Sequence, residues 1–189
     1  MKSRYNFFLS CSIVLLVSFQ YLLLSISFNE ITVSIFGNNP FLTFFSFIND
    51  VFLFVYPILV FLFLCISMRF MFQIFDIKHI STYATITMVG YSNLPFLLGM
   101  IFYNVSVLFF MKEYPSSVDE IENIHFLFDL QIKDFGLINK LCWFLMYYMI
   151  FAFLYFKHKV LAHQALLSTL APTLLFFLFS YMIKMFGSN

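Results

Sequence analysis

The histidines are the first candidates for chemistry in this sequence, because imidazole serves both as a metal ligand and as a general base. His158 and His163 are five residues apart, whereas two ligands on one helical face stand three or four apart. The chain contains no HExxH or GxSxG motif and no intramembrane pair of aspartates, so membrane proteolysis and acyl transfer lack their metal, nucleophile or base. We predict solvated or interfacial histidines, no metal, no cofactor and no enzymatic activity; the histidines are His79, His125, His158 and His163.

The three cysteines form no reactive or metal-binding pattern. Cys11, Cys65 and Cys142 each fall within an apolar run, without CxxC or Cys/His spacing. We therefore expect inert, buried thiols, and neither a disulfide framework nor a zinc site.

Long charge-free runs organise the whole chain. Of the 189 residues, 62% are hydrophobic and 10% are charged. Five runs without Asp, Glu, Lys or Arg approach the roughly 17 to 25 residues that a helix needs to cross a bilayer. We predict an all-α fold, a polytopic membrane helical bundle with an outer amphipathic segment, in a single membrane domain over 1–189. Its five transmembrane helices are expected at about 7–27, 51–68, 82–103, 141–156 and 165–182.

The first span and the segments beside the spans need separate interpretation. Lys2 and Arg4 before an apolar run are typical of a signal peptide as well as of a retained first helix, and we favour retention because the run exceeds a usual signal core. The turn formers Gly37 to Pro40 predict a loop over 28–40, with 41–48 at the interface. The surplus of the third run, 104–111, is expected to be an interfacial extension.

A polar segment follows the third run and includes a predicted surface helix. Ser117 and Glu120 have the spacing of a capping box, and apolar residues recur after them at steps of three or four. We expect this helix to lie on the outer membrane surface and to offer a candidate partner surface that includes Ser117, Ile121, Ile124 and Phe128.

The loop charges predict the orientation of the chain. With the N-terminus inside, the inner side has more basic residues, six against four, in short loops where the positive-inside rule is most reliable. We predict the N-terminus inside and the C-terminus outside, with inner basic loops able to meet anionic lipid headgroups. The inner basic residues are Lys2, Arg4, Arg69, Lys78, Lys157 and Lys159. A net charge of +1 gives no reason to expect a nucleic-acid partner.

Prolines with polar neighbours interrupt three of the predicted spans. Pro95 cannot donate a hydrogen bond to the carbonyl of Tyr91, so a kink is expected there, with Ser92 and Asn93 able to bond the freed carbonyl or a neighbouring helix. Pro57 and Pro172 interrupt the second and fifth spans. Such breaks can outline a packing core or a substrate cavity, and we favour packing. The structural motif comprises Gly90, Tyr91, Ser92, Asn93, Pro95 and Pro172.

Over residues 45–185 the chain resembles the Yip1-domain family of five-span membrane proteins. The resemblance rests on Tyr83-Ala84, on the run from Gly90-Tyr91-Ser92-Asn93-Leu94-Pro95 to Gly99, and on Trp143 ahead of Lys157-His158-Lys159. It implies a non-enzymatic membrane protein. Eukaryotic members of that family act in Golgi vesicle trafficking with small GTPases, whereas bacterial members are often encoded beside export systems or contribute to peptide-toxin immunity.

These observations lead to three hypotheses. The first is an accessory or scaffold subunit for membrane transport, export or peptide-toxin immunity in a bacterial cytoplasmic membrane. Its expected partners are membrane lipids, an ABC-type transporter or other membrane protein, and membrane-active peptides. The second is a small solute or ion transporter with a path near Pro95 and Pro172, and the third is a eukaryotic vesicle-trafficking factor.

Overall fold

The computed structural model describes residues 2–37, 39–110 and 132–187, and over these residues the chain is all-helical with no strand. Two long helices, α1 (Lys2–Phe36) and α2 (Pro40–Ile74), form an antiparallel hairpin. Two shorter helices, α3 (Thr82–Tyr91) and α4 (Leu94–Phe110), follow one another. Helix α6 (Ile132–Ala152) continues into a π-helical turn, η2 (Phe153–Lys157), and α7 (Ala162–Gly187) completes the chain.

Four parts of the described chain are long and apolar enough to cross a membrane by length and composition. They are Arg4–Glu30, Pro40–Ile74, Thr82–Leu108 and Asp134–Lys157. These are the properties of an integral membrane protein. The predicted fifth span, 165–182, falls in α7, which is not one of the four, so a membrane crossing by α7 stays a prediction.

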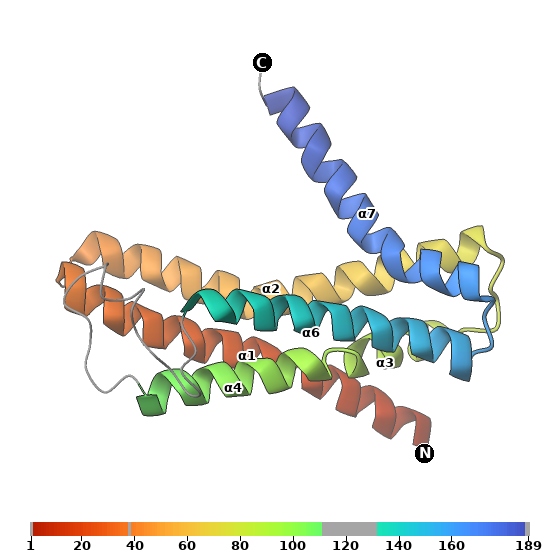
Figure 1. Cartoon of the computed structure of the whole chain (residues 1–189), viewed down its shortest axis with the longest axis horizontal. Coiled ribbons are helices and arrows are strands. Elements are labelled where there is room, and N and C mark those ends of the chain that lie inside the picture. The colour runs from red at the N-terminus through yellow and green to blue at the C-terminus, as the bar shows by residue number, and fades with distance from the viewer. Residues whose placement is uncertain (1, 38, 111–131, 188–189) are drawn as a thin grey trace.

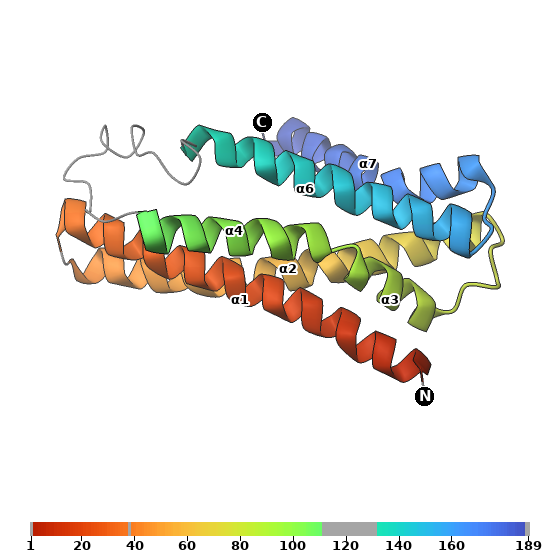
Figure 2. The same cartoon turned by 60° about the horizontal axis from the view of Figure 1, so that its bottom comes forward.

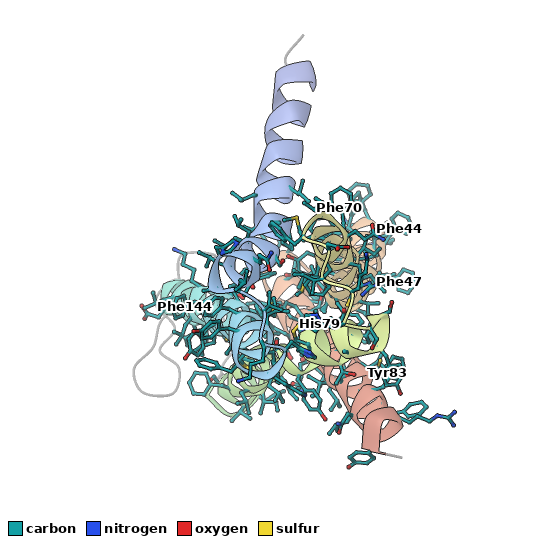
Figure 3. All side chains as sticks on the ribbon, turned by 90° about the vertical axis from the view of Figure 1, so that its right-hand side faces the viewer. Phe44, Phe47, Phe70, His79, Tyr83 and Phe144 are labelled. Atoms are coloured by element: carbon teal, nitrogen blue, oxygen red, sulfur yellow. The ribbon has the colours of Figure 1, made fainter. Side chains whose placement is uncertain are left out.

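The helices lie side by side with their ends in two groups (Figures 1 and 2). One end, on the right in Figure 1, gathers the N-terminus, the loop between α2 and α3 and the loop between η2 and α7. The other end has the turn between α1 and α2, the end of α4 and the start of α6. Helix α1 packs on α2, α3 and α4, whereas α7 packs on α2 and α6. Beyond those contacts α7 points away from the bundle (Figures 1 and 3).

Apolar side chains fill the space between the helices. Fully buried members come from each part of the bundle, including Val17, Met68, Val89, Met146 and Ala165. Many large apolar side chains point outward instead, such as Phe70 and Phe144 in Figure 3. Such a surface is suited to contact with lipid tails.

The turn between α1 and α2 corrects the predicted loop over 28–40. Helix α1 continues to Phe36, and α2 begins at Pro40. The turn formers end helix α1 only at their own positions, because no helix-breaking residue precedes Gly37 in this segment. Gly37 has a φ of 73°. Asn39 caps α2 by accepting from the backbone N–H of Phe41 at 2.9 Å, with Pro40 in the first turn. The predicted interfacial stretch 41–48 is therefore part of α2.

Two further predictions concern the segments after the third run. Residues 104–110 continue α4, and Asn104 is only 5% exposed because it packs within the protein; the interfacial position of 104–111 stays a prediction. The predicted surface helix and its candidate partner surface, with Ser117, Ile121, Ile124 and Phe128, lie outside the described residues.

Candidate functional site

The third span is interrupted at the predicted motif, and its polar side chains bond the preceding helix. The backbone N–H of Asn93 donates to Gly90 O at 3.2 Å instead of to Val89 O. The Asn93 side chain replaces that bond, donating from Nδ2 to Val89 O at 2.8 Å. Ser92 Oγ donates to Met88 O at 2.9 Å. The side chains therefore bond neither the Tyr91 carbonyl nor a neighbouring helix, the two predicted alternatives, because the backbone pattern already changes at Asn93, two residues before Pro95. Pro95 stands in the first turn of α4.

Gly90 brings α3 against α1. A Cβ atom at this position would lie 2.6 Å from Ser10 Cβ and 2.8 Å from Ser10 O. Both residues are buried. Small residues at such a crossing allow two membrane helices to approach closely, so Gly90 serves packing.

Pro172 and the break at Asn93 border two neighbouring spaces. The space beside Asn93 measures about 20 Å³, whereas a groove of about 450 Å³ lies between α2, α6 and α7 beside Pro172. Both are lined by Tyr56, Val60 and Trp143. Within the groove, Thr173 Oγ1 donates to the Tyr147 hydroxyl at 2.5 Å and links α7 to α6.

Two polar contacts between helices were missed by the sequence reasoning. Asn104 Nδ2 on α4 donates to Gln20 Oε1 on α1 at 2.6 Å and to Gln20 O at 2.9 Å. Asp50, within the long apolar helix α2, accepts from Ser25 Oγ at 2.5 Å and from Asn29 Nδ2 at 2.7 Å. No local pattern marks these residues as partners, since each pair is brought together by helix packing.

A pocket of about 410 Å³ opens at the end of the bundle where the N-terminus lies. It is formed by the first turn of α1, one side of α3 and the π-helical turn η2. Figure 3 looks onto this end, with His79 and Tyr83 labelled. The lining residues are Arg4, Asn6, Ser81, Tyr83, Ala84, Thr87, Met88, Tyr91, Phe153, Lys157 and His158.

Local hydrogen bonds hold the walls of this pocket, which we call the basic pocket. Ser81 caps α3 by accepting from the Ala84 N–H at 3.2 Å. Arg69 Nη1 donates to Ile80 O at 2.6 Å and secures the loop before that cap. His79 Nε2 lies 3.0 Å from His158 O, which joins this loop to the turn after α6.

Aromatic contacts position two further walls. The Tyr83 ring stacks on Phe7 of α1, with centroids 4.6 Å apart. Lys157 Nζ lies 5.4 Å from the centre of the Phe153 ring, within the range of a cation–π contact. Tyr91, a residue of the motif, reaches the pocket from the far end of α3, with its hydroxyl 3.5 Å from Asn6 Oδ1.

The basic pocket concentrates positive charge. Its ionisable lining consists of two cations, one histidine and two phenols, namely Arg4, Lys157, His158, Tyr83 and Tyr91. Burial lowers the pKa of His158 below its usual value, and the charges of Lys157 and His79 lower it further. Asp76, in the loop before α3, does not line the pocket and forms an exposed ion pair with Lys78 at 2.8 Å. The pocket is therefore suited to an anion.

Loop charges place Arg4 and Lys157 on the same predicted side of the membrane, but they do not indicate that the two residues and His158 line one pocket. These residues meet because α1 begins, and η2 ends, at the same end of the bundle. One sequence signal could have predicted the pocket: several charge-free runs begin or end with a basic residue. These residues therefore lie at the ends of neighbouring spans.

Comparison with known protein families, with curated proteins and with solved structures finds no match for this chain.

Proposed function

We propose that this chain is a non-enzymatic scaffold or accessory subunit that acts by contact with another membrane protein, in membrane transport, export or peptide-toxin immunity. The proposed setting is a bacterial cytoplasmic membrane with the N-terminus inside. Arg4 and Lys157 line one pocket, and Arg69 bonds Ile80 beside it; this grouping supports the orientation, since basic residues favour the inner side.

One observation supports contact rather than solute passage above all others. The polar side chains of the interrupted third span bond their own helix, and the space beside Asn93 is about 20 Å³. Such a space has room for about one water molecule. The motif is therefore better suited to holding helices together than to passing a solute.

The groove beside Pro172 is the contact face that we propose for a partner helix. Its walls are mainly apolar and aromatic, including Phe63, Trp143 and Tyr147. Helix α7 points away from the bundle beyond its contacts with α2 and α6 (Figure 1), and its residues Pro172 and Thr173 line the groove. Packing of side chains against such walls is what drives association between membrane helices.

Flux measurements test the proposal directly. Proteoliposomes that contain only this chain should show no ion or solute flux above that of empty liposomes. Substrate-specific flux would overturn the scaffold proposal and establish a transporter.

Co-purification in mild detergent tests the contact face. A membrane partner retained by the wild-type protein should be lost from Phe63→Ala, whose side chain lines the groove and is 41% exposed. The matched control is Leu62→Ala, which is 48% exposed and does not line the groove. Equal retention by both variants would exclude the groove as the contact face.

The second candidate function is a small transporter. It is favoured by the three residues, Tyr56, Val60 and Trp143, that the space at Asn93 and the groove at Pro172 share. A small movement of these side chains would connect the two breaks. The flux measurement separates this candidate from the scaffold.

A further inference from the structure

The basic pocket has the chemistry of a phosphate site, and we infer that it binds a phosphate group at the membrane surface. Arg4 offers a planar fork of N–H donors, which matches phosphate oxygens, and Lys157 adds a compact charge. Ser81, Thr87 and Tyr83 place hydroxyl groups in the same lining. This inference does not depend on the scaffold proposal, since a transporter could have the same site.

Three separate elements bring these groups together. Arg4 comes from the start of α1, Lys157 from η2, and Ser81 from the cap of α3. The N-terminus of α3, a helix of ten residues, adds the positive end of its dipole. Among the residues that the structure describes, no carboxylate lines the pocket, and Asp76 is paired outside it with Lys78. A phosphate would therefore meet attraction from each wall.

The position of the pocket corresponds to the headgroup level. Arg4 begins one candidate span, Arg4–Glu30, and Lys157 ends another, Asp134–Lys157. Charged residues at the ends of spans lie where lipid headgroups lie. A volume of about 410 Å³ is within the range of small-molecule sites, so the phosphate can carry a glycerol or similar group. The source is either an anionic lipid headgroup or a soluble phosphate ester, which share this chemistry.

Binding to the purified full chain in nanodiscs tests the inference. One arm raises the fraction of phosphatidylglycerol in phosphatidylcholine discs, and the bound lipid is counted by native mass spectrometry after release. The other arm adds glycerol 3-phosphate to discs of phosphatidylcholine alone and follows the rise in thermal unfolding temperature. Saturable binding in the first arm alone identifies a lipid headgroup, and saturable binding in the second identifies a soluble phosphate ester.

The variants separate the pocket from general surface charge. Arg4→Gln with Lys157→Gln should weaken binding roughly thirtyfold, at about fivefold for each basic residue near a membrane surface. The control compares Lys159→Gln with Lys157→Gln alone, because Lys159→Gln removes one charge from the same end without changing the lining or breaking the ion pair between Asp76 and Lys78. The affinity of Lys159→Gln should stay within about twofold of wild type.

Filling the pocket gives a second test that leaves every charge in place. Thr87→Leu adds apolar volume to the wall and should also weaken binding. This variant decides the matter if the charge-removing pair fails to fold. Three results would overturn the inference. They are an equal loss of affinity in the pocket and control variants, wild-type affinity in Thr87→Leu, and no saturable binding in either arm.

Discussion

Helix α1 is in close contact with α3, whereas α7 meets its neighbours across an open groove. At the first interface a glycine faces a serine, and a Cβ atom would already be 2.6 Å from its neighbour. At the second, Tyr56, Trp143 and Tyr147 stand around a space of about 450 Å³. Small residues allow membrane helices to close on one another, and large rings with a proline keep them apart. The close contact between α1 and α3, which we call the closed side, can supply stability. The groove between α2, α6 and α7, which we call the open side, is then available for a partner.

Substitution of Gly90 should give the largest effect. Gly90→Ala places its new Cβ against the backbone and Cβ of Ser10, which must shift, so we expect a loss of about 1 to 3 kcal/mol in the free energy of unfolding. Gly136→Ala in α6 is the matched control. A Cβ there meets nothing within 4 Å, and alanine is the better helix former by about 0.5 to 1 kcal/mol. Reversible unfolding in detergent measures both, and equal stabilities would show that α1 and α3 are not in close contact.

Double-mutant cycles should give an intermediate effect that sharpens the comparison. Asn104→Leu with Gln20→Leu tests a buried bond between α4 and α1, and its coupling should approach about 1.7 kcal/mol, the upper end for membrane helices. Tyr147→Phe with Thr173→Val tests the bond across the groove. Its coupling should not exceed about 0.6 kcal/mol, the membrane average. A larger coupling at the groove would mean that the open side is as firmly held as the closed side.

Titration of His158 should give the smallest effect on stability. His158 follows η2, between α6 and α7. Its pKa is lowered by burial, then by the Lys157 and His79 charges, so the unfolded chain binds more protons than the folded chain just below the ordinary pKa of about 6.5. The free energy of unfolding should therefore fall as the pH falls from about 7 to 5. The change should be well under about 1 kcal/mol because the ring is partly exposed.

The measurement for this prediction needs a buffer without phosphate, since the pocket beside His158 is the inferred phosphate site. His158→Gln should flatten the dependence of the free energy of unfolding on pH. This variant leaves the other ionisable lining residues Arg4, Tyr83 and Tyr91 in place. An unchanged profile would contradict the prediction and assign the titration to other groups.

The features that sequence reasoning could predict are those with local causes. Runs of apolar residues predict helices, and a break near Pro95 follows from a missing backbone donor. The turn at Gly37 also has a local cause, but the predicted loop over 28–40 is too long. Turn-forming residues end a helix without unwinding the turns that precede them. Helix ends depend on which helix packs beside them, which the sequence does not state.

Features that need packing could not be predicted in the same way. Asn104 was assigned to an interfacial extension because the preceding span was already long enough, yet Gln20 on another helix gives it a buried partner. Likewise, Arg4 and Lys157 share a pocket only because the packing of the helices brings the start of α1 beside η2. The same is true of the groove at Pro172, whose walls come from three helices.

The length of the α1–α2 hairpin has a consequence for the membranes that can hold it. Each helix has 35 residues and is therefore about 52 Å long, against a hydrocarbon layer of about 30 Å. From Asp50 to Arg69 the distance along α2 is about 28 Å, so we expect these two charges at the surfaces of a bilayer of ordinary thickness. In a thicker bilayer Asp50 would be drawn inward, where Ser25 and Asn29 already solvate its carboxylate in place of water. We therefore expect the hairpin to tolerate membranes of different thickness, to which most single spans adapt only by tilting or by deforming the lipid.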